Sequence, residues 1–221
     1  MNKVLNFLVR SLIHLTLGIR HMLRDLRHWS AISPYIDYNF LRYHGVDVEF
    51  GSVRLIGFPI IRKARNSRIS IGRGVTLVSH SRGNPAGINH PVILATLSAG
   101  ATISIGNGCG LSGAALCSAS AIDVGDFSGF GANAMAYDTD FHPVKDFGTP
   151  SDSISTAESK PISIGKYVWI GANAMILKGV VVEDRAVIGA GAVVRTNIPA
   201  GSVYLGHAPH PGAPDQRPSQ P

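Results

Sequence analysis

The sequence is poor in charge, and it holds only two cysteines. Asp, Glu, Lys and Arg make up 15% of the 221 residues, where a soluble domain usually has about 25%. Cys109 and Cys117 exclude a disulfide-dense scaffold and form no paired CxxC motif, so neither zinc binding nor redox chemistry is indicated and a reducing compartment fits best. A hydrophobic content of 45% excludes a disordered chain. In place of charge, the sequence has 25 glycines and 13 prolines.

The positive charge is concentrated in the first part of the chain. Residues 1–82 contain 13 Lys and Arg against 4 Asp and Glu, a balance of +9, whereas residues 83–221 contain 7 against 10, a balance of −3. This asymmetry indicates either a solvated basic face or an anionic partner such as a glycan or a membrane. Nucleic acid is not expected, because the basic region lacks interleaved aromatic residues and any groove-reading motif. Within residues 46–82 the basic residues are Arg54, Arg62, Lys63, Arg65, Arg68, Arg73 and Arg82.

The first thirty residues predict an amphipathic helix. Their apolar residues recur every three or four positions, at Leu5, Leu8, Leu12, Leu15, Ile19, Met22 and Leu26. Polar residues interrupt this run too often for it to span a bilayer, and no apolar core precedes a cleavage site of small residues, so no signal peptide is expected. The helix either packs within the assembly or lies on an anionic membrane surface. We therefore expect a cytoplasmic protein, with peripheral contact to the inner membrane face as the second interpretation.

From residue 162 onward the chain repeats every six residues. Aliphatic side chains occupy every sixth position at Ile164, Ile170, Ile176, Val182, Ile188 and Val194, and smaller or branched ones follow four positions later at Val168, Ala174, Val180, Ala186, Ala192 and Ile198. An α-helix would place successive members of such a series roughly 240° apart, which rules out one shared helical face. A short strand followed by a turn, repeated, satisfies the period, and this hexapeptide pattern is typical of a β-helix.

Weaker copies of the period define the domain. They run from Ile71 to Leu77, from Ile105 through Leu111 to Cys117, and from Val124 through Phe130 to Ala136. Residues 79–95 and 137–160 lack the repeat and are predicted to be loops extruded from the coils, where function often resides. We therefore divide the chain into a helical segment (1–45), an all-β β-helix domain (46–206) and a Pro-rich tail (207–221).

The stretch from Lys160 to Gly206, with its VWIGAN run, and the DFHP loop before it resemble the hexapeptide-repeat acyltransferases. Within that family they are most similar to the maltose, galactoside and polysaccharide O-acetyltransferases. The resemblance implies a left-handed parallel β-helix, a homotrimer, and acetyl-CoA bound in a groove between neighbouring β-helices. It also implies a saccharide acceptor, in polysaccharide or lipopolysaccharide biosynthesis, and no metal.

Three other functions stay open on this scaffold. The first is N-acyl transfer to a nucleotide-linked amino sugar. The second is a non-catalytic trimeric scaffold. The third is a metal enzyme like the gamma-type carbonic anhydrases, although His80, His90 and His142 form no close pair of metal ligands.

The resemblance assigns the general base to His142, which lies where the family places a histidine in the loop before the WIG coil. An imidazole can accept a hydroxyl proton near neutral pH. Asp140 and Asp138 lie two and four residues earlier and are candidates to orient the imidazole. They could equally be ordinary residues of the loop turns.

The remaining candidates concern ligand binding. By resemblance, the backbone amide of Ala172 contacts the thioester oxygen, the backbone of Ala190 meets the pantetheine arm, and Trp169 lies beside the groove or forms its wall. Lys178, Arg195 and the backbone of Thr196 are candidates for CoA phosphates. Asn84, Asn89 and His90 in the first loop are candidates to bind the sugar, or they are plain turn residues.

Overall fold

The computed structural model describes residues 29–143, 148 and 153–206. The amphipathic stripe expected from Leu5 to Leu26 and the Pro-rich segment 207–221 lie outside these residues. The described part begins with helix α2 (Trp29–Tyr43) and continues into eighteen short strands and one turn of 3-10 helix, η1 (Ser81–Gly83).

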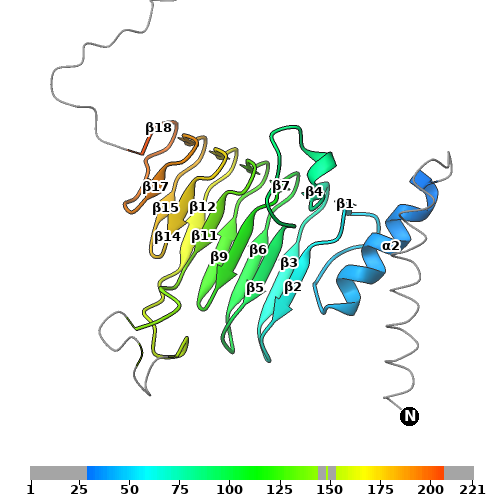
Figure 1. The fold of residues 1–221 in the computed structure, drawn as a ribbon, viewed down its shortest axis with the longest axis horizontal. Coiled ribbons are helices and arrows are strands. Elements are labelled where there is room, and N and C mark those ends of the chain that lie inside the picture. Colours follow the sequence, from blue (N-terminus) through cyan, green and yellow to red (C-terminus); the bar gives the residue numbers. More distant parts are fainter. Residues whose placement is uncertain (1–28, 144–147, 149–152, 207–221) are drawn as a thin grey trace, which may run out of the picture.

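The strands form three parallel sheets that wrap into a triangular prism, and each of the first five turns of the chain adds one strand to every sheet (Figure 1). The first sheet contains β1 (Val53–Ile56), β4 (Val75–Val78), β7 (Gly110–Ser112), β10 (Gly129–Phe130), β13 (Trp169–Ile170), β16 (Val187–Ile188) and β18 (Val203–Tyr204). The second contains β2 (Ile60–Lys63), β5 (Ile93–Thr96), β8 (Ala115–Ser118), β11 (Met135–Tyr137), β14 (Met175–Leu177) and β17 (Val193–Val194). The third contains β3 (Arg68–Ile71), β6 (Thr102–Ile105), β9 (Ala121–Val124), β12 (Ile162–Ile164) and β15 (Val181–Val182).

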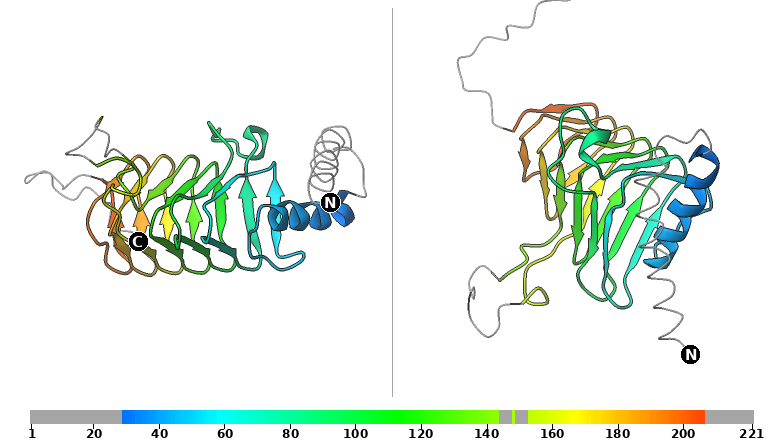
Figure 2. Two further views of the ribbon diagram at one scale, coloured as in Figure 1. Left: turned by 90° about the horizontal axis from the view of Figure 1, so that it is seen from below. Right: turned by 45° about the vertical axis from the view of Figure 1, so that its right-hand side comes forward.

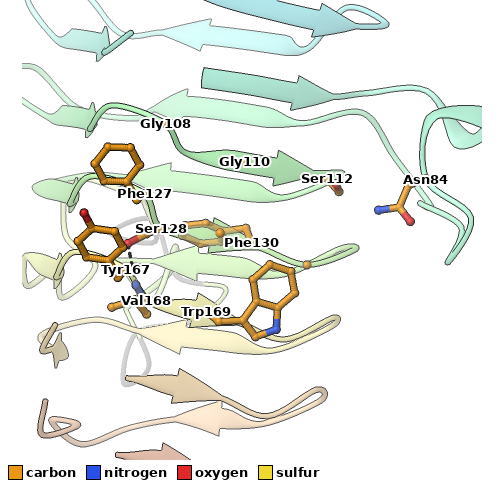
Figure 3. A pocket seen from close by; sticks show the side chains of 12 residues that line it. Asn84, Gly108, Gly110, Ser112, Phe127, Ser128, Phe130, Tyr167, Val168 and Trp169 are labelled. Carbon is orange, nitrogen blue, oxygen red and sulfur yellow. Dashed lines mark hydrogen bonds between the residues drawn. The ribbon is translucent and has the colours of Figure 1, made fainter. Parts of the chain in front are cut away.

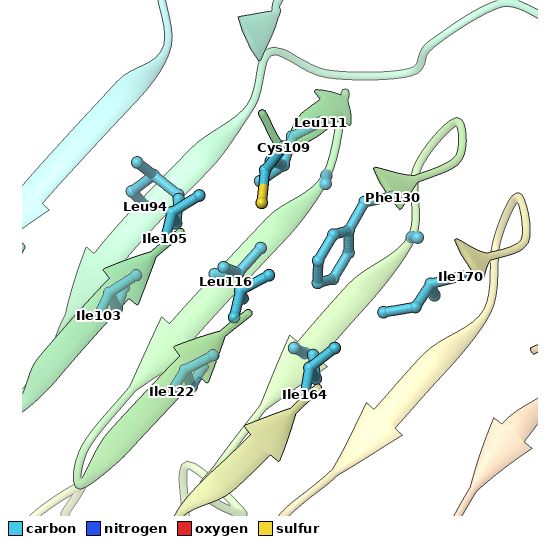
Figure 4. Packing of buried hydrophobic residues seen from close by; sticks show 14 of the residues in the cluster. Leu94, Ile103, Ile105, Cys109, Leu111, Leu116, Ile122, Phe130, Ile164 and Ile170 are labelled. Carbon is cyan, nitrogen blue, oxygen red and sulfur yellow. The ribbon is translucent and has the colours of Figure 1, made fainter. Parts of the chain in front are cut away.

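The six-residue period is the reason for this shape. Each hexad supplies one strand and one corner, and its aliphatic residue points into the prism, where Ile170 and Ile176 are fully buried. The side chains of successive coils stack along the interior (Figure 4). The sequence analysis was wrong at one inward position, Cys117. The spacing from Leu111 to the next inward residue is five rather than six, so that residue is Leu116. Cys117 therefore lies on the outer side of the second sheet.

The corners depend on close backbone approach between coils. A Cβ atom on Gly171 would lie 2.5 Å from the amide nitrogen of Ala190 in the next coil. Real side chains cannot tolerate this distance, so the glycine that follows the hexad aliphatic is required at this corner.

Helix α2 closes the end of the prism at which the strands begin (Figure 2). Phe40 and Leu41 are buried in the same core as the first coil, and the carboxylate of Asp37 accepts a hydrogen bond from the Leu55 amide at 2.9 Å. The helix ends at Tyr43, and Gly45, two residues later, has a φ of 71°, the left-handed conformation that favours glycine after a helix C-terminus. Within the described residues no helix is long and apolar enough to cross a membrane.

Two loops leave the prism at different edges. The first joins β4 to β5, at the edge between the first and second sheets, which we call the 1–2 edge. The second joins β11 to β12, at the edge between the second and third sheets, the 2–3 edge. Strand β5 includes residues 93–95, which the sequence assigned to the end of the first loop, because Leu94 takes the inward position of this coil.

The outer faces of the second and third sheets differ in chemistry. The outward row along the second sheet is apolar throughout: Ile60, Ile93, Ala115, Met135, Met175 and Val193. The corresponding row along the third sheet is mostly polar: Ser70, Ser104, Asp123, Ser163 and Val181. Ile60 and Val193 in the second-sheet row are 38% and 36% exposed, and an exposed apolar sheet face favours contact with another protein surface.

Candidate functional site

A groove of about 440 Å³ lies on the outer face of the first sheet (Figure 3). It is lined by Asn84, Gly108, Gly110, Ser112, Phe127, Ser128, Gly129, Phe130, Gly131, Tyr167, Val168 and Trp169. Two residues predicted from the sequence, Asn84 and Trp169, are therefore brought together although 85 positions separate them.

The floor of the groove results from two glycines that stand side by side on neighbouring strands. Gly110 pairs with Gly129, and Gly129 pairs with Trp169. A Cβ atom on Gly129 would lie 2.8 Å from the Trp169 ring, so this glycine lets the indole lie flat over the backbone. A Cβ atom on Gly110 would meet nothing within 4 Å, so this part of the floor is open.

An aromatic column forms the opposite wall. The rings of Phe127 and Tyr167 stack at 5.1 Å with an interplanar angle of 14°, and the Arg185 guanidinium lies 5.7 Å from the Tyr167 centroid. All three residues have φ near 60° at the corner that precedes the first sheet. The sequence analysis did not identify this wall. A usable signal was present, because Gly125-Asp-Phe127 and Gly165-Lys-Tyr167 place an aromatic residue at the same phase of two hexads.

The 1–2 edge holds the two predicted backbone amides. Ala172 and Ala190 follow β13 and β16 at this edge, one coil apart, and neither amide donates a hydrogen bond to any described residue. Ala172 packs on a small apolar cluster of Val78, Ile88 and Ala132. Ile88 belongs to the first loop, so this cluster packs the loop against the prism. Two stacked N–H groups beside the groove could bind the oxygen atoms of a ligand.

The first loop also carries the predicted sugar-binding residues. The Asn84 side-chain oxygen accepts a hydrogen bond from the Ala86 amide at 2.9 Å, which is ordinary turn chemistry, while its side chain still lines the groove. The Asn89 amide is held by the Asn133 side chain at 2.8 Å. The Nδ1 nitrogen of His90 lies 2.8 Å from the Pro91 carbonyl oxygen, which requires a proton on Nδ1.

His142 lies at the 2–3 edge, in the second loop. Its side chain is exposed. The loop begins with a short antiparallel pairing of Thr139 with Ser159, and Phe141 takes a φ of 63° directly before the histidine. The ring of Phe141 also packs edge-on against Tyr137 at 5.3 Å. This local geometry fixes how the chain leaves the coil at His142.

Asp138 is a buried residue that closes the turn of the preceding coil. Its carboxylate accepts hydrogen bonds from the Ser118 hydroxyl at 2.7 Å and from the amides of Ala119 and Ser120 at 2.6 and 2.9 Å. A buried carboxylate needs such donors to offset its desolvation. The sequence left this residue as an imidazole partner or a turn residue, and these three bonds give it the second role.

Asp140 bonds to Lys178, whose ammonium lies 2.5 Å from its carboxylate and 3.3 Å from that of Glu158. The hydrogen bond to Asp140 is the main cause that raises the pKa of Lys178, and bonds to Lys160 and Lys178 lower the pKa of Glu158. Lys178 was proposed from the sequence to contact CoA phosphate. In the described structure it ties both ends of the second loop to the coil that follows.

The predicted site residues thus fall into two groups on one chain. Asn84, Asn89, His90, Trp169, Ala172 and Ala190 lie on the first sheet and the 1–2 edge, whereas Asp138, Asp140, His142, Lys178, Arg195 and Thr196 lie on the 2–3 edge. In a triangular prism the 2–3 edge is opposite the first sheet. The apolar second sheet separates the two groups.

The two thiols are protonated at neutral pH. Burial is the main cause that raises the pKa of Cys109, and burial with the nearby Asp138 charge raises that of Cys117 to about 11. In the part of the chain that the structure describes, no cluster of three or more His, Cys, Asp or Glu is placed to hold a metal ion.

The comparison with known proteins identifies the repeat. Residues 161–196 match the family described as bacterial transferase hexapeptide (six repeats). These residues of the chain are hexapeptide repeats. The fold expected from the sequence was a left-handed parallel β-helix. This match and the likeness to solved structures of the same fold confirm that expectation.

The chain is 48% identical over 48 residues to galactoside O-acetyltransferase of Escherichia coli (strain K12). That alignment covers 22% of this chain and 24% of the relative, so the similarity spans about a quarter of the relative's length. The solved structure of the polySia-specific acetyltransferase NeuO matches with a TM-score of 0.51 and 22% identity, over 68% of this chain and 63% of that one. AntD, an N-acyltransferase from Bacillus cereus, matches with a TM-score of 0.51 and 18% identity, over 76% of this chain and 83% of that one.

Proposed function

We propose that this protein is an acyltransferase that moves an acetyl group from acetyl-CoA to a saccharide hydroxyl, in the assembly or modification of a polysaccharide. The observation that carries the proposal is the placement of the two residue groups along both edges of the apolar second sheet. The relatives named O-acetyltransferase and polySia-specific acetyltransferase support the reaction class.

The chemistry divides between the two groups. Acetyl-CoA supplies a thioester carbonyl as the acyl donor. The His142 imidazole takes the proton of the acceptor hydroxyl, and the oxygen attacks the carbonyl carbon. The Ala172 amide donates a hydrogen bond to the carbonyl oxygen as negative charge develops there, and the Ala190 amide holds the adjacent arm of the donor. When the C–S bond breaks, the imidazolium returns its proton to the departing thiolate.

Asp138 and Asp140 act as positioning residues in this mechanism. Asp138 fixes the turn beneath the second loop, and the Asp140–Lys178 pair fixes both ends of that loop. Arg195 and Thr196 are exposed at the same edge, where they can bind the phosphates of the donor.

The complete site forms between chains in a cyclic trimer. Contact through the second sheet brings the 2–3 edge of one chain next to the 1–2 edge of its neighbour, because these two edges border that sheet on either side. A closed threefold ring repeats this contact three times and leaves no apolar sheet exposed. One chain then contributes His142, and its neighbour contributes the groove with Trp169 and Ala172.

N-acyl transfer to a nucleotide-linked amino sugar is the second candidate, since the structure of an N-acyltransferase shares the fold. Release of CoA from acetyl-CoA is measured with hydroxyl acceptors and with amino-sugar acceptors. Turnover restricted to amine acceptors would replace the first candidate with the second.

The role of His142 is tested by His142→Ala. His44→Ala is the matched control, because His44 directly follows helix α2 and belongs to neither group of predicted site residues. We expect a loss in kcat of about 100- to 10,000-fold for His142→Ala and near-normal turnover for the control. Full turnover of His142→Ala with hydroxyl acceptors would refute the base assignment.

Complementation tests whether sites form between chains. Gly110→Trp fills the groove without a clash in the coil, because a Cβ there meets nothing within 4 Å. Each of His142→Ala and Gly110→Trp should be inactive alone, and trimers co-expressed from both should recover about a quarter of the intact sites. Site formation within one chain predicts no recovery.

A further inference from the structure

We propose that the end of the prism capped by helix α2 is a docking surface for an anionic membrane. This surface, which we call the basic end, is defined by Tyr35, Phe50, Arg54, Lys63 and Arg65. The proposal does not depend on the transferase activity, because it concerns a different part of the molecule.

The basic end contains positive charges without acidic partners. Arg68 pairs with Asp47 at 2.8 Å and Arg73 pairs with Glu49 at 2.7 Å, so these two acidic residues are already engaged. By contrast, Arg54, Lys63 and Arg65 are exposed and form no ion pair with a described residue. Unpaired cations at an exposed surface are available to phosphate headgroups.

These charges surround one end of the prism. Arg54 and Lys63 belong to the first strands of the first and second sheets, and Arg65 lies in the turn that follows. The Lys63 ammonium lies 3.4 Å from where a Cβ on Gly45 would stand, so it is placed against the C-terminal end of α2. The three positive charges therefore lie on the first coil of the prism, next to helix α2.

The same end exposes aromatic rings. Tyr35 on α2 is 60% exposed and Phe50 is 53% exposed, and their ring centroids are 4.8 Å apart. Exposed aromatic side chains next to basic residues are typical of surfaces that enter the interfacial layer of a bilayer. A soluble polyanion would engage the charges but would not account for the exposed ring pair.

The uneven distribution of charge along the chain favours an orientation in which the basic end faces the membrane. The described residues from 29 to 82 contain 8 Lys and Arg against 3 Asp and Glu, and those from 83 to 206 contain 5 against 7. The net charge of the described residues is thus +5 up to residue 82 and −2 beyond it, which favours contact through the basic end. In the proposed trimer the three basic ends point in one direction, which multiplies the binding.

The test is sedimentation of the full chain with vesicles of phosphatidylcholine alone or mixed with phosphatidylserine. The triple variant Arg54→Gln/Lys63→Gln/Arg65→Gln removes three cations from the basic end. Each basic residue near an anionic surface changes the partition coefficient about fivefold, so we expect the triple variant to bind on the order of 100-fold more weakly. Native binding should also weaken as salt is raised, because the charges are exposed.

The matched control is Lys160→Gln/Lys166→Gln/Arg195→Gln, which lowers the net charge equally in the later coils. It should bind the mixed vesicles nearly as well as the native chain. Equal loss in both triple variants, or no loss in the first, would overturn the assignment of the basic end.

A double variant tests the aromatic contact. Tyr35→Ser/Phe50→Ser should lower the binding that remains at high salt by about tenfold, because it removes the apolar contribution. Binding of the native chain to heparin but not to mixed vesicles would overturn the membrane proposal in favour of a polyanionic glycan. Circular dichroism confirms in each case that the variant is folded.

Discussion

The second and third sheets of the prism are built by the same hexads, yet their outer faces have opposite chemistry. Both sheets point aliphatic residues inward, and Ile122 of the third sheet is as completely buried as Leu116 of the second. Outward, the second sheet carries Met135 and Met175 where the third carries Asp123 and Ser163. The repeat therefore determines the interior alone, and each outer face is free to specialise for water or for another chain.

The comparison extends to the edges. The 2–3 edge, which borders both faces, carries the second loop with His142, and the 1–2 edge borders the second sheet on its other side. The polar third sheet has site residues along only one of its two edges, the 2–3 edge. An apolar face bordered on both sides by site residues is what a chain needs if its sites are completed by a neighbour.

A charge on the second sheet should have the largest effect. Val193 and Val181 are exposed to 36% and 39%, and each lies in a two-residue strand, one on the second sheet and one on the third. Val193→Asp and Met135→Asp should raise the dissociation constant of the proposed trimer by at least about 100-fold, because each would bury an unpaired carboxylate between chains. Light scattering coupled to size exclusion measures the assembly.

Val181→Asp is the matched control and should leave the assembly unchanged, since the third sheet faces water. Dissociation by Val181→Asp with no effect of Val193→Asp would exchange the roles of the two faces.

The second largest effect is expected at the edge where these sheets meet. Asp138→Asn leaves the amides of Ala119 and Ser120 and the Ser118 hydroxyl facing an amide group in place of a carboxylate. Loss of these buried charge-assisted bonds should lower the free energy of unfolding by about 2–4 kcal/mol. The melting temperature should fall by roughly 5–15 °C.

Asp126→Asn provides the comparison at the exposed edge between the third and first sheets. There Asp126 accepts hydrogen bonds from Asn107 and pairs with Lys166 at 3.2 Å. These bonds, the backbone bond from Asn107 first, lower the pKa of Asp126. Any stabilisation from this group is present above its unfolded pKa and is lost as the pH falls, so at neutral pH the variant should melt slightly lower. A larger loss from Asp126→Asn than from Asp138→Asn would contradict the role of burial.

The sequence was sufficient to predict the interior of the fold, because inward positions are decided by local spacing. Ile164, Ile170 and Ile176 are buried as the period requires. The prediction was wrong at Cys117, where a hexad shortened by one residue moves Leu116 inward. Spacing alone does not reveal a shortened hexad when both neighbouring residues are apolar.

The site was less predictable than the interior. Which residues come together there depends on the edge or sheet of the prism at which the fold places each of them. Trp169 and Asn84 share a groove only because the first loop leaves the coil beside β4 and folds over the first sheet. The wall formed by Phe127 and Tyr167 results from stacking between coils, which a linear motif does not record. The role of Lys178 likewise depends on a loop whose two ends return to the same edge.

A moderate effect is expected from releasing that loop. Lys178→Met removes both ion pairs that join Asp140 and Glu158 to the following coil. We expect kcat to fall about tenfold through misplacement of His142, with KM for acetyl-CoA nearly unchanged. Lys166→Met, which breaks the exposed pair with Asp126 on another edge, should change neither constant. A rise in KM without a fall in kcat would instead support a direct contact of Lys178 with CoA.

The smallest effect concerns the reactivity of Cys117, which lies on the outer side of the second sheet. Because its pKa is raised to about 11, the thiolate is scarce at pH 8 and the alkylation rate should rise about tenfold for each pH unit up to that value. Assembly through the second sheet covers this thiol, so at fixed pH the Met135→Asp chain should react several-fold faster than the native chain. Mass spectrometry after timed iodoacetamide treatment measures both rates. Equal rates in the native and dissociated proteins would mean that the second sheet faces solvent, as the third does, and that its apolar row has another purpose.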